Sequence, residues 1–288
     1  MTSSPVITFA VCGSRVAARI AGDPASPALL LIHGFPSSSK TFRYLMRDLS
    51  AIFRVIAPDL PGFGASEVVD NPTFAGFADV IEDLLDQLDV PSFYLYLHDY
   101  GAAVGLHLAT RRPERIRGLI IQNANAHRSG LGDQWSDTER FWSDPGPDTE
   151  AKATAHLTFE GTRDQYVGGI PGEIAERMDE DRWLEDWQIM SLPGRLQLQR
   201  ALVLDYGRHV ARFDQIARYL RESQPPALMV WGRHDIFFDL DETLSWMNAL
   251  PRMEAHILDG GHFLLETNAD QVASLMKQFI CRTEDARR

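Results

Sequence analysis

Cysteine is scarce in this sequence. Only Cys12 and Cys281 occur among its 288 residues, near opposite ends of the chain, and no Cys-x-x-Cys pair is present. Such spacing supplies neither a disulfide framework nor the clustered ligands of a metal site. We therefore expect no metal, no cofactor and a reducing compartment.

Positive charge and long apolar runs are also in short supply. Lys and Arg number 28 against 40 Asp and Glu, a formal net charge of -12, which gives no support to nucleic acid or an anionic membrane as a partner. No apolar run approaches the roughly 20 residues of a membrane helix. The opening residues MTSSPVITFAVCGS lack the basic and apolar regions of a signal peptide. We expect a cytoplasmic protein whose oligomeric state is open, a homodimer included.

Apolar runs of strand length alternate with stretches of helical periodicity through the first 125 residues. The expected strands of this part are 6–12, 15–20, 28–32, 54–57, 92–97 and 116–122. The expected helices are 40–49, 73–88 and 102–111. This alternation predicts an α/β fold, in which a mostly parallel sheet carries helices on both faces.

The alternation stops after about Asn123. Residues 126–221 contain no buried-strand run and include amphipathic helical stretches at 150–159 and 196–203, whereas strand signals return at 226–231 and 254–258. A helical insertion of the size of a small domain explains this pattern. The expected organisation is a core of residues 1–125 and 222–288, interrupted by a helical cap of residues 126–221.

The expected strand at 92–97 passes into a small-residue helix at His98-Asp99-Tyr100-Gly101. So abrupt a change forces a sharp turn whose apex side chain, here Asp99, projects from the sheet edge, as in the nucleophile elbow G-x-S-x-G. Leu97 stands at the first glycine position of that motif. A carboxylate nucleophile would form an alkyl ester with its substrate. The alternative interpretation of Asp99 is a helix N-cap without a catalytic role.

Two further polar residues follow expected strands. Asp235 lies in a turn after the strand at 226–231, and His262 lies in the loop Asp259-Gly260-Gly261-His262-Phe263 before the last helix. With Asp99, they give the chain order nucleophile, acid, base. Each falls just beyond the carboxyl end of a strand, the edge at which open α/β sheets build their sites.

In these motifs and their order, nearly the whole sequence resembles the α/β-hydrolase fold family, whose sheet is mostly parallel and eight-stranded. His33-Gly34-Phe35-Pro36 resembles its oxyanion loop, and the loop Asp59-Leu60-Pro61-Gly62-Phe63-Gly64-Ala65-Ser66 is also similar. His-Asp-aromatic-Gly at the elbow resembles the branch that contains epoxide hydrolases and haloalkane dehalogenases. The resemblance implies that Asp99 is the nucleophile, His262 the general base and Asp235 the acid that orients it. It also implies that the backbone N–H groups of Phe35 and Tyr100 form the oxyanion hole.

The leaving group is the open question. Dehalogenases usually carry Trp after the nucleophile and often Asn after His-Gly, where this sequence has Tyr100 and Phe35. Epoxide hydrolases commonly have Phe-Pro after His-Gly and use cap tyrosines to protonate the opening alkoxide. The candidate leaving-group and substrate residues, all on the expected cap or beside it, are Tyr166, Tyr206, Trp183 and Asn123.

The favoured function is therefore an epoxide hydrolase that acts on a small apolar electrophile with water. The first alternative is a haloalkane dehalogenase, in which a cap tryptophan such as Trp183 would bind the halide. A non-catalytic ligand-binding protein is the alternative of another class, and a cofactor-free oxygenase of the luciferase type is a further one. The presence of an acid and a base beside Asp99 disfavours the binding protein, because a receptor needs no base.

Overall fold

The computed structural model describes residues 5–287, so Met1–Ser4, on which part of the signal-peptide expectation rests, lie outside it. Its centre is one sheet of eight strands in the order β1-β2-β4-β3-β5-β6-β7-β8. The strands are β1 Val6–Val11, β2 Ser14–Ala21, β3 Ala28–Ile32, β4 Arg54–Pro58, β5 Phe93–His98, β6 Ile116–Gln122, β7 Ala227–Gly232 and β8 Glu254–Leu258. The strands β3 to β8 pair in parallel, while β2 pairs antiparallel with both β1 and β4. The mostly parallel eight-stranded sheet expected from the sequence is confirmed.

Helices cover both faces of this sheet because its central strands are apolar on both sides. Every residue of β3 is buried, and its successive side chains enter two separate cores: Leu29 and Leu31 join one, Leu30 and Ile32 the other. That division follows from the alternation of side chains along a strand. The helices of the core are α1 Arg43–Leu49, α2 Phe74–Gln87, α3 Tyr100–Arg111, α11 Asp241–Ala249 and α12 Leu265–Asp285.

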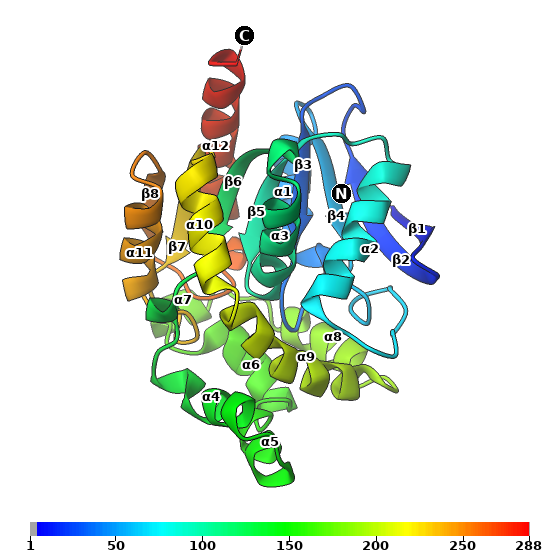
Figure 1. Cartoon of the computed structure of the whole chain (residues 1–288), viewed down its shortest axis with the longest axis vertical. Coiled ribbons are helices and arrows are strands. Elements are labelled where there is room, and N and C mark those ends of the chain that lie inside the picture. The colour runs from blue at the N-terminus through cyan, green and yellow to red at the C-terminus, as the bar shows by residue number, and fades with distance from the viewer. Residues whose placement is uncertain (1–4, 288) are drawn as a thin grey trace.

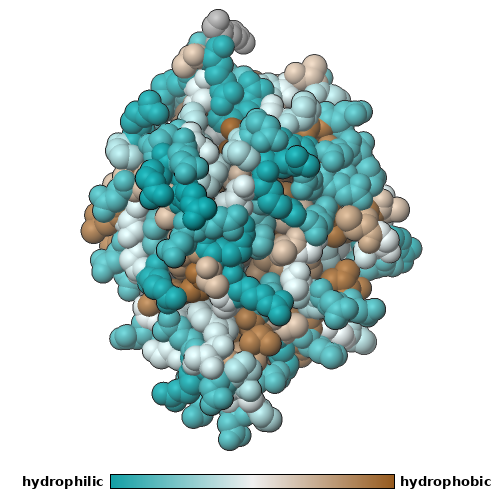
Figure 2. Space-filling model, in the orientation of Figure 1, coloured by the Kyte–Doolittle hydropathy of each residue, from teal (hydrophilic) through white to brown (hydrophobic). Residues whose placement is uncertain are grey.

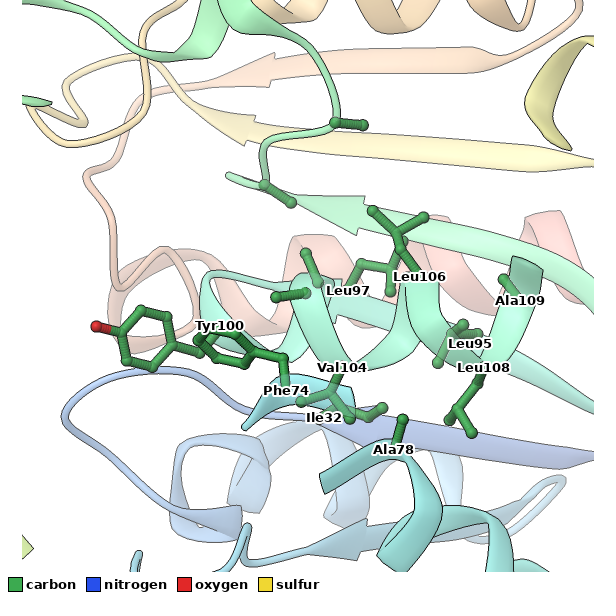
Figure 3. Packing of buried hydrophobic residues seen from close by; sticks show 14 of the residues in the cluster. Ile32, Phe74, Ala78, Leu95, Leu97, Tyr100, Val104, Leu106, Leu108 and Ala109 are labelled. Atoms are coloured by element: carbon green, nitrogen blue, oxygen red, sulfur yellow. The ribbon is translucent and has the colours of Figure 1, made fainter. Parts of the chain in front are cut away.

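The larger core lies between the sheet and the layer that contains α2 and α3. Figure 3 shows Phe74 of α2 and Tyr100 of α3 side by side, with Ile32 of β3 and Val104 close by. The Phe74 and Tyr100 rings meet edge to face, with centroids 5.0 Å apart. This contact anchors the first turn of α3, and therefore the residue just before it, against the body of the protein.

The segment between β6 and β7 is helical. It contains α4 Ser136–Ser143, α5 Pro147–Ala153, α6 Phe159–Val167, α7 Gly172–Ala175, α8 Glu180–Met190, α9 Arg195–Val210 and α10 Phe213–Ser223. Figure 1 shows α4, α5, α6, α8 and α9 gathered below the sheet, at the end of the molecule opposite the C-terminus. In contrast, α10 packs against α3 and α11 beside the sheet. The exact cap boundaries at 126 and 221 stay a prediction.

One expected helix is wrong. The stretch 150–159 is not continuous, because α5 ends at Ala153 and α6 begins at Phe159. Thr158 starts the second helix by accepting a hydrogen bond from the Gly161 N–H through its side chain. A Thr that can cap a new helix competes with continuation of the preceding one.

The molecular surface is mixed in character. Figure 2 shows a largely hydrophilic face on which apolar side chains form small separate groups. Within residues 5–287, no helix is both long and apolar enough to cross a membrane.

Candidate active site

Asp99 stands at the sharp turn between β5 and α3. Its backbone has φ 50° and ψ -126°, a conformation that costs energy for a residue with a side chain. The turn closes because Gly101 has no side chain: a Cβ there would lie 2.1 Å from the Ile32 carbonyl oxygen. Leu97 is accommodated in the first glycine position because Gly105, one turn into α3, leaves space for its Cδ2 atom. The elbow expected from the sequence therefore forms without its first glycine.

The carboxylate of Asp99 points at the loop that follows β3. The Phe35 N–H donates to Asp99 Oδ1 over 2.5 Å, and the Tyr100 N–H also faces the carboxylate. Gly34 is required for this approach, because a Cβ there would lie 2.1 Å from Asp99 Oδ1. The Asp99 side chain makes no capping hydrogen bond to α3, so the N-cap interpretation finds no support. Asp99 instead faces the donors expected of an oxyanion hole.

His33 holds that loop in place. Its Nε2 accepts a hydrogen bond from the Leu60 N–H at 3.0 Å, and its Nδ1 lies 3.0 Å from the Gly34 carbonyl oxygen. Burial lowers the pKa of His33, which keeps the imidazole neutral and therefore able to accept at Nε2. The side chain thus connects the 33–36 loop to the 59–66 loop.

His262 lies between Asp235 and Asp99. Its Nδ1 is 2.8 Å from Asp235 Oδ2, and its Nε2 is 3.9 Å from Asp99 Oδ2. Since a carboxylate can only accept, Nδ1–H donates to Asp235 and the Nε2 lone pair faces Asp99. Nε2 has no hydrogen-bond partner among the side chains and backbone of residues 5–287. The structure therefore brings Asp99, Asp235 and His262 together at the carboxyl edge of the sheet.

Burial and charge act in opposite directions on these groups. Desolvation raises the pKa of Asp99, while His262 and the Tyr100 and Phe35 N–H groups oppose the rise. For His262, desolvation lowers the pKa, but Asp235 and Asp99 outweigh it, so that its pKa is raised above the ordinary value. A buried imidazole whose proton is held by a carboxylate has the arrangement of a general base.

Asp235 is fixed by neighbours on both sides. The N–H groups of Phe237 and Phe238 donate to its Oδ1 at 2.7 and 3.2 Å, and the Asn123 amide donates to its Oδ2 at 2.8 Å. Asn123 in turn accepts from the Gly232 N–H at 2.9 Å. The expectation that Asn123 faces substrate is therefore corrected: it lies behind the acid, because its backbone, with φ 39°, turns the amide toward β7.

The backbone of His262 is held as well, by Gln122 and Tyr96, which the sequence did not indicate. The Gln122 amide donates to the His262 carbonyl oxygen at 3.0 Å, and the Tyr96 hydroxyl donates to Gln122 Oε1. The His98 ring lies against the His262 ring, with centroids 4.7 Å apart. Gln122 is the last residue of β6, but nothing in the alternation of a buried strand distinguishes an amide that supports the loop of His262.

A cavity of about 140 Å³ opens beside Asp99. It is largely aromatic, with a few uncharged polar groups. Its lining consists of Phe35, Asp99, Tyr100, Gln134, Trp135, Thr138, His156, Gln165, Val203, Tyr206, Phe237 and Phe238. Of the cap residues expected at the leaving group, only Tyr206 is among them. The sequence does not single out His156, in the turn between α5 and α6, or Gln165 on α6, because isolated polar residues of the insertion have no distinguishing spacing.

Tyr206 is held rigidly in the cavity wall. Its ring stacks on Trp135, with centroids 4.8 Å apart, and on Trp142, with centroids 6.0 Å apart. Both indole N–H groups are already used: Trp135 donates to the Phe237 carbonyl and Trp142 to the Val203 carbonyl, each at 2.8 Å. These tryptophans therefore shape the wall without offering a hydrogen-bond donor to a ligand.

Tyr166 and Trp183 lie elsewhere. The Tyr166 hydroxyl donates to Asp186 Oδ2 at 2.5 Å, and its ring stacks on Phe263, with centroids 4.0 Å apart. Trp183 packs against Tyr166 at 5.7 Å between centroids. The expectation that these two residues contact the leaving group is corrected, because both belong to a buried cluster that ties α6 and α8 to the His262 loop.

That cluster provides a stability prediction. Burial raises the pKa of Asp186 to about 7, far above its value in an unfolded chain. A carboxyl group whose pKa is raised on folding stabilises the protein at low pH, and the stabilisation is lost as pH rises toward 7. The Asp186→Asn variant lacks this ionisation. We expect its Tm, relative to that of the parent, to increase between pH 5 and pH 8 by several degrees, as scanning calorimetry would measure. A pH-independent difference in Tm would contradict the assignment.

Residues 27–269 match the family model described as the alpha/beta hydrolase fold. The chain belongs to the α/β-hydrolase family. The resemblance expected from the sequence is confirmed, and the chain is a hydrolase, as its relatives also indicate.

Several relatives cover nearly the whole chain. An uncharacterized hydrolase of Saccharomyces cerevisiae is 33% identical over 91% of this chain and 91% of its own. A cis-3-alkyl-4-alkyloxetan-2-one decarboxylase of Shewanella oneidensis is 28% identical over 89% of this chain and 82% of its own. Epoxide hydrolase 3 of Mus musculus is 24% identical over 93% and 74%. Among solved structures, the haloalkane dehalogenase DbeA from Bradyrhizobium elkani has a TM-score of 0.76 at 24% identity, covering 98% of this chain and 99% of that one. The last similarity concerns the fold alone.

Proposed function

We propose that this protein is an epoxide hydrolase that uses Asp99 as its nucleophile. The observation that carries the proposal is the composition of the cavity wall beside Asp99. A phenol, Tyr206, lines it, whereas the indole N–H of its tryptophan, Trp135, is already bound to a backbone carbonyl. An opening epoxide needs a proton donor for its alkoxide, and a departing halide needs hydrogen-bond donors such as free indoles. The wall supplies the first requirement.

In the first step, an Asp99 carboxylate oxygen attacks an epoxide carbon and the C–O bond of the ring breaks. The product is an ester between Asp99 and the substrate, together with an alkoxide. Phe35 and Tyr100 hold the other carboxylate oxygen by their N–H groups, which fixes the direction of attack. Burial of Asp99 removes the water that would otherwise screen its charge.

Tyr206 is suited to protonate the alkoxide. Burial and the nearby Asp99 raise the pKa of Tyr206 well above its ordinary value, so that its proton is present at neutral pH. The nearby Asn125 side chain opposes that rise in the pKa, and Tyr206 lines the cavity beside Asp99. His156 lies in the same wall and packs on Phe35 with centroids 5.6 Å apart, but its neutral imidazole donates its N–H to the Ala153 carbonyl.

In the second step, His262 takes a proton from water through Nε2, and the resulting hydroxide attacks the carbonyl carbon of the Asp99 ester. The tetrahedral oxyanion that forms stays on the oxygen held by Phe35 and Tyr100. Collapse of this intermediate breaks the bond to the alkyl oxygen, which takes the proton of the His262 imidazolium and leaves as the alcohol of the diol. The acid proton left on Asp99 passes to the Tyr206 phenolate, which restores the Asp99 carboxylate and the phenol. Asp235 stabilises the His262 imidazolium that exists during the step.

The relatives support the reaction class, whereas the proposed substrate is inferred from the residues of the site. One is named an epoxide hydrolase and another an oxetan-2-one decarboxylase, and a chain of the same fold is named a haloalkane dehalogenase. The first two names involve strained oxygen rings. A dehalogenase would find no free indole on Trp135 or Trp142, and a ligand-binding protein would have no use for the His262 and Asp235 pair.

The two cap tyrosines offer a matched test of this proposal. We expect Tyr206→Phe to lower kcat for a styrene-oxide-like epoxide by about 10- to 100-fold, because the loss of one proton donor removes general acid assistance. Tyr166→Phe should leave kcat near the parent value, since its hydroxyl is bound to Asp186 outside the cavity. Steady-state kinetics of both variants, with melting curves to confirm folding, would measure the difference.

The same assay with bromoalkanes separates the alternatives. Release of bromide at rates above those of epoxide opening would favour a dehalogenase. Equal activity of the two Tyr→Phe variants on epoxides would remove Tyr206 from the mechanism.

A further inference from the structure

The cavity beside Asp99 contains no positive charge. Within the part of the chain that the structure describes, neither Lys nor Arg lines it, and its polar members other than Asp99 are uncharged amides, hydroxyls and an imidazole. The imidazole is His156, whose pKa is lowered by burial to about 4, so it carries no charge at neutral pH. Asp99 is thus the only charged group in the lining.

The backbone and indole N–H groups beside Asp99 are already engaged, so that only uncharged side-chain donors face a ligand. The N–H groups of Phe35 and Tyr100 face the Asp99 carboxylate, and the Trp135 N–H is bound to Phe237. His262, whose pKa is raised by its neighbours, lies between the Asp99 and Asp235 carboxylates, so the site sets two carboxylates against one imidazole that both of them already engage. The chain as a whole carries a formal net charge of -12, which disfavours the approach of anions.

The size and the apolar walls of the cavity also disfavour an anionic ligand. A volume of about 140 Å³ admits a molecule comparable to a monosubstituted aromatic ring, and a ligand of that size displaces water that would otherwise hydrate a carboxylate. Phe35, Phe237 and Phe238 present apolar ring surface to that volume. Burying an ion in such surroundings without a partner is costly.

We propose that this site selects compact, uncharged epoxides and rejects those that bear a carboxylate near the oxirane ring. The inference rests on the proposed function and narrows its substrate class. Two like charges about 6 Å apart, at an effective dielectric constant of about 20, repel by an amount equal to about a hundredfold in affinity. We expect discrimination of at least that size.

Pairs of epoxides with the same shape and different charge test this. Glycidamide carries a neutral NH₂ where glycidate carries an anionic O⁻. The pair 4-nitrostyrene oxide and 4-carboxystyrene oxide likewise compares a neutral group with an anionic one, farther from the oxirane ring. For each compound, kcat/KM is divided by the uncatalysed hydrolysis rate, which removes differences in intrinsic reactivity. We expect the neutral member of each pair to be preferred by about a hundredfold or more. Equal values within either pair would overturn the proposal.

A variant that adds a cation at the cavity mouth tests whether charge causes the preference for neutral epoxides. Gln134 lines the cavity and is exposed. We expect Gln134→Lys to narrow the preference within the styrene oxide pair by about tenfold, because a cation near the substrate offsets the repulsion. The control Gln134→Met, which has a side chain of similar length and no charge, should leave the preference within the styrene oxide pair unchanged. If neither Gln134→Lys nor the neighbouring Thr138→Lys narrows the preference, charge does not cause it and the proposal is wrong.

Failure of this inference is distinguishable from failure of the proposed function. If no epoxide of either charge is opened while the protein is folded, the epoxide hydrolase assignment fails. If neutral and anionic epoxides are opened equally well, that assignment stands and the substrate class proposed here fails.

Discussion

One turnover of an epoxide in oxygen-18 water is expected to leave the label in the carboxylate of Asp99 and to release an unlabelled diol. Water attacks the carbonyl carbon of the Asp99 ester, so its oxygen stays on Asp99 when the alkyl oxygen departs. The geometry that leads to this expectation is the contact of Asp99 Oδ1 with the Phe35 N–H and of His262 Nε2 with the other oxygen at 3.9 Å. Mass spectrometry of the peptide that contains Asp99, after single turnover with excess enzyme, would measure the label.

Among single substitutions, replacement of Asp99 should cause the largest loss of activity. We expect Asp99→Ala to reduce kcat by at least about 10,000-fold, as removal of a nucleophile does in other covalent hydrolases. Loss of the carboxylate also removes a buried charge that is only partly compensated, so the variant should be at least as stable as the parent. Its melting temperature is therefore a control for folding. Label in the diol with none in Asp99 would mean that water attacks the epoxide directly, and would exclude a covalent ester.

The framework that positions Asp99 was predictable because burial on both faces of a sheet leaves a simple trace in sequence. A strand covered by two layers of helices is apolar at every position, as the run Ala28-Leu29-Leu30-Leu31-Ile32 is, and all five residues are buried in β3. The turn at Asp99 was predictable for a similar reason. Only a small residue tolerates the approach of another backbone, and Gly101 stands where the Ile32 carbonyl oxygen approaches α3.

The cavity wall was not predictable, because long-range contacts decide it. Tyr166 and Tyr206 both lie on helices of the insertion and both are buried, at 2% and 1% exposure, so burial does not distinguish them. What separates them is the partner of each hydroxyl. Asp186, on another helix, holds that of Tyr166, whereas the rings of Trp135 and Trp142 direct Tyr206 to the cavity. No periodicity within one helix carries that information.

The role of Asn123 was missed for a comparable reason. An amide at the end of β6 could turn toward the substrate or toward the neighbouring strand. A left-handed backbone at Asn123 and a free N–H on Gly232 select the second direction, where the amide bonds both Gly232 and Asp235. The polarity of the residue was visible in the sequence, but its partner belongs to β7, more than a hundred positions later.

Replacement of His262 is expected to stop the reaction after its first step. We expect His262→Gln to lower kcat by about 100- to 10,000-fold, the usual contribution of a general base, while Asp99 still attacks the epoxide. The ester should therefore accumulate, and intact mass spectrometry should show the protein heavier by the mass of one substrate molecule. His256→Gln, a change on β8 away from the cavity, should leave both turnover and mass unchanged. A His262→Gln protein that neither turns over nor gains mass would show that His262 is needed for the first step.

The pH dependence of the parent enzyme should report the same group, with a sign that follows from its surroundings. Asp235 and Asp99 outweigh burial and raise the pKa of His262 in the free enzyme, so its imidazolium persists there to higher pH than usual. During turnover, kcat should fall as pH falls through the pKa of His262 in the ester intermediate. Ester formation neutralises Asp99, which removes one of the two charges that raise the pKa. Formation of the ester should therefore lower the pKa of His262 and leave the imidazole neutral, ready to take a proton from water. Consistent with this, kcat should reach its plateau at a lower pH than the pKa of His262 in the free enzyme, as histidine NMR titration would measure it. Asp235→Asn should lower the pKa of His262 in the free enzyme, because it removes a charge that raises it. An unchanged titration of His262 in this variant would contradict the assignment of Asp235 as the group that holds His262 in its protonated form.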